Sequence, residues 1–322
     1  MSDESGHSFI GAWARVSEDL EAADTTDVGV DSSGRVFAFS RSEKSVLVFE
    51  TDGALSHRWG GPGVFDRPHS IYVGPEDTIW VTDTGTNDVR EYSPEGELLR
   101  SIDPEPVDNR NFSGRPFAEC THVTVDAETG EIFVSDGYLN AAVHRFSPEG
   151  KLIKSWGSPG CGPGQFCVPH NIATDSAGLI FVADRHNGRI QIFDRDGELQ
   201  KIVYDVGLPN ALHFGAHDGA PALYVVELSN MTFPTMTDYQ AADEWIQIPS
   251  VGHRVTIRGL DGSLLATLAA GGAGTADGQL AGPHGIAADA AGSVFLAELK
   301  PRPRIEGFMT SVLKLERESP AS

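Results

Sequence analysis

Short runs of apolar residues recur along the chain with a period of about 40–50 residues, which is typical of a repeat architecture. The first series of runs is rich in β-branched and aromatic residues, and each run ends at or beside a polar or acidic residue. Its six copies are VFAFSR, TIWVTDT, EIFVSDGY, LIFVADR, ALYVVEL and SVFLAEL. Each copy is predicted to be one strand of a repeating unit.

A second series follows the first, with alternating apolar residues that mostly lead into an Asp-Gly or Glu-Gly turn. Its copies are SVLVFETDG, DVREYSPEG, AVHRFSPEG, RIQIFDRDG, RVTIRGLDG and SVLKLERES. This alternation predicts half-buried strands, and the turns are those of hairpins. A further strand comes after five of the turns, as in GKLIKSWG, but the sixth copy ends without one.

The N-terminal segment HSFIGAWARV (7–16) has the pattern that the sixth copy lacks. We infer that it supplies the outer strand of the last unit and closes a ring, which would remove exposed strand edges. The sequence therefore predicts an all-β fold, a six-bladed β-propeller closed by an N-terminal strand. Residues 1–322 are expected to form this single domain.

The fifth unit is longer than the others because residues 229–253 intrude between its second and third strands. Long insertions in compact folds are often lids or binding loops. This insertion carries Phe233, Tyr239 and Trp245, so it could equally be a loop that packs its own aromatic residues against the propeller.

The charge of the chain excludes some classes of partner. With 24 Lys and Arg residues against 46 Asp and Glu, the formal net charge of −22 would repel nucleic acids and anionic membrane surfaces. No run of residues is apolar enough for a membrane helix, and the first residues lack the basic and apolar stretches of an export signal. Three cysteines cannot form a dense disulfide framework, so we expect a reducing, cytoplasmic location.

Each unit begins with an innermost strand whose entry motif can be aligned, for example PHSI, PHNI and PHGI. The second positions of the six motifs are Thr26, His69, Thr121, His170, Asn210 and His284. The histidines fall in alternate units, so the pseudo-sixfold symmetry should direct all three at the channel axis. Three protein ligands with an open fourth position are typical of catalytic zinc, whereas a single channel histidine would more often be structural.

A second ring of positions lies just past the next strands and includes Arg41, Tyr138 and Arg185. Arginine suits a carboxylate ligand, and a phenol near a dication can lose its proton and act as a base. We therefore expect a small substrate that bears a carboxylate or another planar anion. In the alternative interpretation, both arginines pair with channel acids: Asp83, Asp136 or Asp184.

Over nearly its whole length the chain resembles the peptidyl-α-hydroxyglycine α-amidating lyases, which are zinc propellers of the NHL-repeat group. The similarity is densest over residues 131–157 and 164–193, which include SDGY and ADRHNGRIQ. It implies a Zn²⁺ site at His69, His170 and His284. It also implies that Tyr138 is the catalytic tyrosine and that Arg185 and Arg41 are active-site arginines.

These lyases cleave the C–N bond of a carbinolamide to release glyoxylate and a primary amide. The resemblance implies that zinc binds the substrate hydroxyl and that Tyr138 takes its proton. Gly285 departs from the pattern, because the family has an acid there that serves the catalytic centre and a structural Ca²⁺, so calcium is left open. Leu139 follows Tyr138, and the disulfides that secreted members carry near this motif are absent.

We therefore expect a zinc-dependent lyase acting on a small intracellular carbinolamide or a related α-hydroxy acid derivative. One alternative is a propeller hydrolase such as a lactonase, in which metal-bound water attacks an ester. Lactonase propellers usually bind calcium through carboxylates. The tripod formed by His69, His170 and His284 does not match such a ligand set. The other alternative is a non-catalytic NHL-repeat scaffold, which predicts a metal-free channel.

Overall fold

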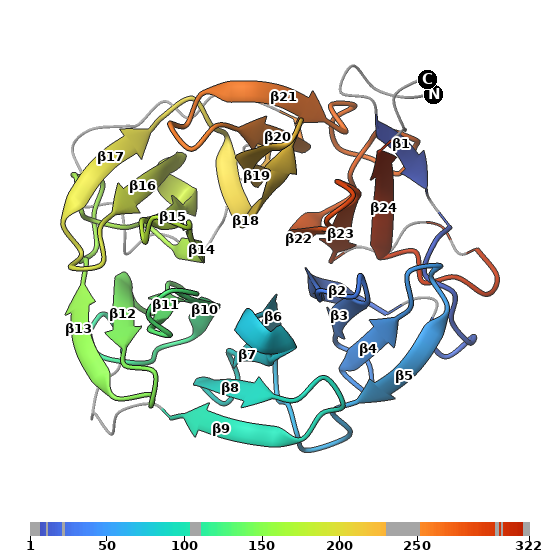
Figure 1. Ribbon diagram of the computed structural model, residues 1–322, viewed down its shortest axis with the longest axis horizontal. Helices are drawn as coiled ribbons and strands as arrows, with labels where there is room; N and C mark the ends of the chain where they lie inside the picture. The colour runs from blue at the N-terminus through green and yellow to red at the C-terminus, as the bar shows by residue number, and fades with distance from the viewer. Residues whose placement is uncertain are drawn as a thin grey trace.

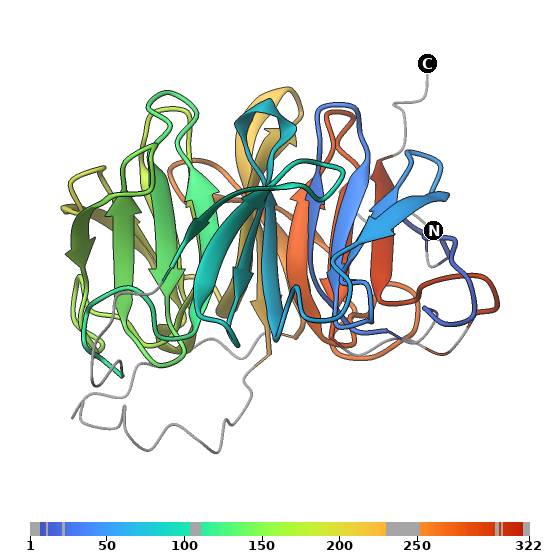
Figure 2. The same cartoon turned by 90° about the horizontal axis from the view of Figure 1, so that it is seen from below.

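The computed structural model describes residues 7–10, 12–20, 23–103, 111–229, 252–299, 303 and 305–317. These residues form six four-stranded antiparallel sheets arranged as blades around a central channel (Figure 1). The predicted six-bladed β-propeller is thereby confirmed. Figure 2 shows the blades standing side by side around the ring, with the turns between innermost and second strands on the upper face.

The first three blades follow the order of the chain from the channel outward. Blade one consists of β2 (Thr25–Val30), β3 (Val36–Ser40), β4 (Val46–Phe49) and β5 (Leu55–Trp59). Blade two consists of β6 (Pro68–Val73), β7 (Ile79–Asp83), β8 (Asp88–Tyr92) and β9 (Leu98–Ile102), with a 3₁₀ turn, η1, at Pro75–Asp77. Blade three consists of β10 (Cys120–Val125), β11 (Ile132–Asp136), β12 (Ala142–Phe146) and β13 (Leu152–Trp156).

The last three blades continue this pattern until the ring closes. Blade four consists of β14 (Pro169–Thr174), β15 (Ile180–Asp184), β16 (Arg189–Phe193) and β17 (Leu199–Val203), with a second 3₁₀ turn, η2, at Arg185–Asn187. Blade five consists of β18 (Leu208–His217), β19 (Ala220–Leu228), β20 (Arg254–Arg258) and β21 (Leu264–Leu268). Blade six consists of β22 (Pro283–Ala288), β23 (Val294–Glu298), β24 (Val312–Arg317) and β1 (His7–Ile10).

The core lies between neighbouring blades rather than at one centre. Strands β3, β7, β11, β15 and β23 are buried along their whole length, because each is covered on both faces by adjacent blades. In one such layer Phe37 and Phe39 of blade one pack with Ile71, Ile79 and Val81 of blade two. The outermost strands are partly exposed, which explains their more polar sequences.

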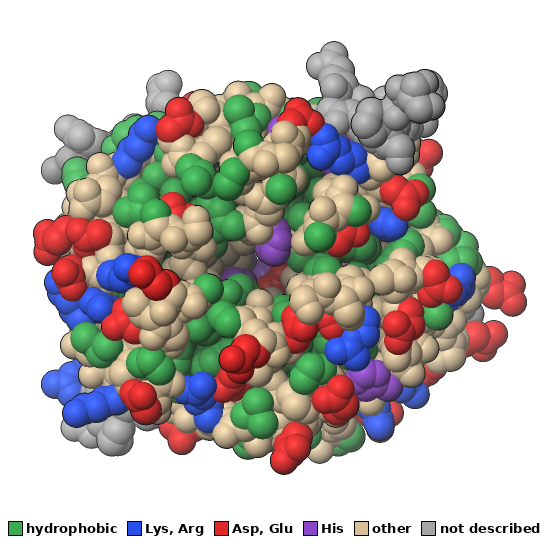
Figure 3. Space-filling view, viewed as in Figure 1, with side chains coloured by type: hydrophobic (Ala, Val, Ile, Leu, Met, Phe, Trp, Pro, Cys, Tyr) green, Lys and Arg blue, Asp and Glu red, His purple; other side chains and the backbone are tan. Residues whose placement is uncertain are grey.

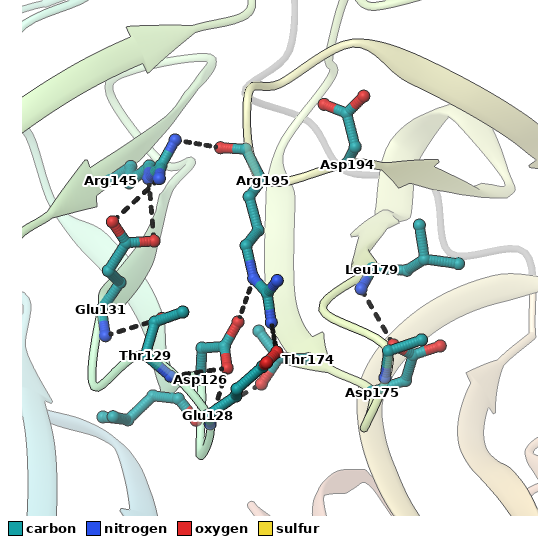
Figure 4. Close-up of polar contacts among 12 residues, drawn as sticks. Asp126, Glu128, Thr129, Glu131, Arg145, Thr174, Asp175, Leu179, Asp194 and Arg195 are labelled. Carbon is teal, nitrogen blue, oxygen red and sulfur yellow. Dashed lines mark hydrogen bonds and ion pairs between the residues drawn. The ribbon is translucent and has the colours of Figure 1, made fainter.

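Charged side chains also link adjacent blades. The Arg195 guanidinium of blade four binds Asp126 (2.5 Å) and Glu128 (2.6 Å) of blade three (Figure 4). Arg145 of blade three pairs with Glu131 of its own blade at 2.8 Å, and its Nη1 donates to the Arg195 carbonyl oxygen at 2.8 Å. The Asp126 carboxylate also accepts backbone N–H groups in the turn after β10. This network fixes a turn and a blade contact together.

The N-terminal strand closes the ring as the sequence predicts. Strand β1 pairs antiparallel with β24, with His7 opposite Arg317 and Ile10 opposite Lys314. The segment after it also contributes to the core, because the buried Trp13 contacts Phe49 of blade one and Phe295 of blade six. The N-terminal segment thus holds the first and last blades together.

The expected insertion of blade five does lie between β19 and β20. Its two ends meet, because the Ser229 backbone N–H donates to His253 Nδ1 at 3.1 Å. The aromatic residues Phe233, Tyr239 and Trp245 lie outside the described residues. Within the described ranges no helix is long and apolar enough to cross a bilayer, and all three cysteines are free.

We predict that deletion of residues 1–18 lowers the thermal unfolding midpoint or causes aggregation. The deletion exposes the edge of β24 and removes Trp13 and Ala14 from the core between blades six and one. Deletion of residues 1–6 is the matched control and should leave unfolding unchanged. Equal melting of the two truncated proteins, measured by calorimetry, would contradict the closing role of the strand.

Candidate metal centre

A β-bulge at the second residue of every innermost strand positions the site. In the pairing of β6 with β7, Pro68 lies opposite Asp83 and Ser70 lies opposite Thr82, so His69 has no partner in the ladder. A bulge re-aims the side chain of the unpaired residue. The other innermost strands skip the equivalent residue, and the six skipped residues are Thr26, His69, Thr121, His170, Asn210 and His284.

The bulges bring the three histidines together on the channel axis. One ring nitrogen from each of His69, His170 and His284 lies within 4.8 Å of the others, and all three side chains are buried. The imidazole rings meet edge to face, with centroids 4.9–5.1 Å apart. Among the described residues, this is the one cluster of three or more His, Cys, Asp or Glu side chains that could hold a metal ion.

Backbone carbonyls of the other three bulges orient the imidazoles. His69 Nδ1 lies 2.6 Å from the Thr121 carbonyl oxygen, and His284 Nδ1 lies 2.6 Å from that of Thr26. His170 Nδ1 lies 2.7 Å from the Asn210 carbonyl oxygen. A carbonyl oxygen can only accept a hydrogen bond, so each Nδ1 carries the proton and each Nε2 presents a lone pair.

The histidines are held neutral. Burial lowers the pKa of His69 and of His170 well below the usual histidine value, with added contributions from neighbouring positive groups. Burial also lowers the pKa of His284 to about 3. Neutral imidazole is the form that binds a metal ion.

Tyr138 completes the centre from blade three. Its hydroxyl lies 2.9 Å from His69 Nε2 and 2.9 Å from His170 Nε2. The phenol has one proton and can donate it to one of these nitrogens, while the tripod presents three lone pairs. The donor set therefore has more acceptors than protons, and three convergent imidazole nitrogens fit a divalent cation such as zinc.

The two predicted arginines lie in different environments. Arg185 is buried, its guanidinium carbon lies 5.6 Å from the centroid of the Tyr138 ring, and its Nη1 donates to Asn210 Oδ1 at 3.0 Å. Burial lowers the pKa of this guanidinium. Arg41 is exposed, although its charge contributes to lowering the pKa of His284. The structure thus brings Tyr138 and Arg185 to the tripod and leaves Arg41 at the edge of the site.

The channel acids have other roles than the alternative interpretation gave them. Asp184 forms an ion pair with Arg189, with Nε and Oδ2 2.7 Å apart. Asp83 accepts backbone N–H groups from residues 66, 67, 85 and 86, and Asp136 accepts from the backbone of Ala118. These carboxylates fix the loops that enter and leave the blades.

Sequence reasoning missed a close contact beneath the tripod. A Cβ atom placed on Gly285 would lie 2.0 Å from Asp27 Oδ1 and 2.6 Å from Asp27 Cα. Asp27 is buried, and its carboxylate accepts the backbone N–H groups of Val28 (2.9 Å) and Ile71 (3.1 Å). Gly285 therefore makes room for an acid contributed by blade one. The sequence signal was the Asp in the TTDV motif, but nothing in the sequence pairs it with Gly285.

Comparison with known proteins supports a relation to the amidating lyases. The family model of the NHL repeat matches residues 166–193, which include His170 and Arg185. Peptidylglycine alpha-amidating monooxygenase of Rattus norvegicus is 38% identical over 165 residues, 48% of this chain and 16% of that protein. Peptidyl-alpha-hydroxyglycine alpha-amidating lyase 1 of Drosophila melanogaster is 34% identical over 161 residues, 47% of this chain and 29% of that protein. The resemblance seen in the sequence is confirmed over about half of this chain, which spans less than a third of the length of these two proteins.

Other similar proteins carry different names. NHL repeat-containing protein 3 of Homo sapiens is 33% identical over 181 residues, 52% of this chain and 51% of that protein. A streptogramin B lyase structure has a TM-score of 0.60 at 14% identity and covers 98% of this chain and 100% of that one. A gluconolactonase from Xanthomonas campestris has the same TM-score and identity, with 98% and 96% covered. At this identity the two structures establish the fold alone.

We predict that Gly285→Ala destabilises the protein by about 1–3 kcal/mol, because the added methyl group would overlap the Asp27 backbone. Gly61→Ala is the matched control, since a Cβ at Gly61 would meet nothing within 4 Å. Denaturant unfolding of both variants gives the comparison. Equal stability of the two would show that the contact between Gly285 and Asp27 is looser than described.

Proposed function

We propose that this chain is a zinc-dependent lyase that cleaves the C–N bond of a carbinolamide, such as an α-hydroxyglycine derivative, to an amide and glyoxylate. The observation that carries the proposal is the Tyr138 hydroxyl, 2.9 Å from Nε2 of both His69 and His170. A proton-transferring group is thereby held where three neutral imidazoles converge. Small α-hydroxy acid derivatives related to this substrate would meet the same groups.

Zinc is the proposed metal because three imidazole nitrogens with space for a fourth ligand are a common catalytic zinc set. His69, His170 and His284 would hold the ion. When bound, zinc supplies a Lewis acid for a hydroxyl oxygen. No described carboxylate joins the tripod, so the donor set does not favour calcium at this position.

Tyr138 is the proposed base. In its deprotonated form, the Tyr138 oxygen would accept the proton of the substrate α-hydroxyl. The C–O bond then becomes a carbonyl, the C–N bond breaks, and the nitrogen leaves with the electron pair and takes up the proton that Tyr138 accepted. The Arg185 guanidinium carbon lies 5.6 Å from the centroid of the Tyr138 ring, a cation–π contact that helps to hold the ring in position.

Arg185 is also the proposed carboxylate partner. A guanidinium binds a carboxylate through two parallel hydrogen bonds, which orients the substrate as well as holding it. The contact with Asn210 fixes one edge of this guanidinium. Arg41 belongs to the opposite blade and is exposed, so we assign it a role in attracting the anion.

The lyase proposal is favoured over the two alternatives. Hydrolysis of a lactone could use the same tripod, but the relatives at 34–38% identity are named for amidation. A non-catalytic scaffold has no need for a tyrosine hydroxyl and a buried arginine beside three histidines. The name of the human relative states the repeat and no activity.

We predict one zinc ion per purified chain and its loss in His170→Ala, because only two of the three imidazoles that would hold the ion remain. His57→Ala is the matched control, since His57 lies on the outermost strand of blade one and contacts the Pro94 carbonyl. Metal content is measured by mass spectrometry after dialysis. Stoichiometric zinc in His170→Ala would contradict the ligand assignment.

We also predict that the zinc-loaded protein releases glyoxylate from an N-acyl-α-hydroxyglycine. In Tyr138→Phe, kcat should fall about 10²-fold or more. Phenylalanine keeps the ring but lacks the oxygen that accepts the proton. Zinc content should not change, because His69, His170 and His284 are intact. Tyr204→Phe, at an exposed position, is the control. Full turnover by Tyr138→Phe would exclude Tyr138 as the base, and no turnover by the zinc-loaded parent would contradict the proposed function.

A further inference from the structure

The channel continues past the tripod to the other face of the propeller. The histidines lie at the second residue of their strands, and a cavity of about 220 Å³ lies among the later residues of the same strands. All six innermost strands line it, through Val28, Tyr72, His122, Thr174, His213 and Ile286 among others. Figure 3 looks onto this face, where histidine atoms are visible in the central hollow.

We propose that this cavity is a second binding site, for a small uncharged molecule that has an N–H or O–H donor and an apolar body. We call it the far chamber. It lies at the end of the channel opposite Tyr138 and Arg185, which follow the second strands. It takes no part in the proposed lyase reaction, and the inference does not depend on that reaction.

His122 supplies the acceptor that a donor group would meet. This residue is 6% exposed, and its Nδ1 is buried with no hydrogen-bond partner in the described structure. Its Nε2 lies 3.6 Å from Asp27 Oδ2. In the neutral ring only one nitrogen carries a proton, and with that proton on the nitrogen that faces the carboxylate, Nδ1 presents a lone pair. A buried acceptor without a partner favours a ligand, or water, that can donate to it.

The walls disfavour ions of either sign. None of the described lining residues is Lys or Arg, and the chain carries a formal charge of −22, so an anion would find no partner. The nearby Asp27 carboxylate already accepts two backbone N–H groups and faces His122, so it is not available to a cation. Burial lowers the pKa of His213 to about 4, so this wall is uncharged near neutral pH.

The remaining lining fits an apolar body. Val28, Leu212 and Ile286 contribute aliphatic groups from blades one, five and six. The hydroxyls of Thr124 and Thr174 lie 3.2 Å apart and hydrogen-bond each other. This combination, apolar walls with a few placed polar groups, is typical of small-molecule sites.

The test compares two isosteric probes, isobutyramide and isobutyrate, on the zinc-loaded full chain. Saturation-transfer NMR and titration calorimetry should detect saturable millimolar binding of the amide, because its N–H groups can donate to His122 Nδ1. Isobutyrate should bind at least tenfold more weakly at the far chamber. Since Arg185 could hold isobutyrate at the metal end, both titrations are repeated in Arg185→Ala, where the amide should still bind unchanged.

Two substitutions of His122 locate the binding. His122→Phe removes the acceptor and should reduce amide affinity at least tenfold, whereas His122→Asn keeps an acceptor near the position of Nδ1 and should retain most of it. Absence of saturable amide binding to the parent would mean that the cavity holds water and would overturn the proposal. Equal binding of acid and amide in Arg185→Ala, or unchanged amide binding in His122→Phe, would also overturn it.

Discussion

The site depends on one backbone irregularity, the bulge at the second residue of each innermost strand. A residue in a regular ladder directs its side chain toward a neighbouring blade and its carbonyl toward a neighbouring strand. The bulge releases both groups from the sheet. In blades two, four and six the released side chain is a histidine that reaches the axis. In blades one, three and five the released carbonyl accepts the Nδ1 proton of the histidine in the preceding blade. The same distortion therefore brings the three histidines together and orients them.

This arrangement makes the tripod a property of the closed ring. Each histidine is oriented by the blade that follows it, so no blade could form its part of the centre alone. The pair of His284 and the Thr26 carbonyl spans the junction where the last blade meets the first. Trp13 packs at the same junction, and β1 completes the sheet of blade six beside it. Closure of the ring and geometry of the metal centre are thus linked through the N-terminal segment.

The sequence was sufficient for features that repeat and insufficient for features that depend on contacts between blades. Repeated strand and turn patterns gave the six blades, the closing strand and the three histidines, because equivalent positions in a symmetric ring have equivalent surroundings. The bulges leave no local signature, since an entry motif such as PHSI reads as ordinary strand. The contact of Asp27 with Gly285 joins residues 258 positions apart, and no alignment of repeats brings them together. The difference in exposure between Arg41 and Arg185 also arises from their surroundings, because both follow the second strand of their blades.

The six backbones at the axis are nearly equivalent, so the chemistry of the channel is set by which side chains stand at a few ring positions. At the bulge level, three histidines alternate with Thr26, Thr121 and Asn210. One residue further along these strands, Asp27 faces His122 and lies against Gly285. The blades can therefore support two proposed sites of opposite character in one channel, for a cation and for an uncharged molecule, without any change of fold. For the same reason, propellers that share this backbone can carry unrelated names, and the argument for function must come from the residues at these levels.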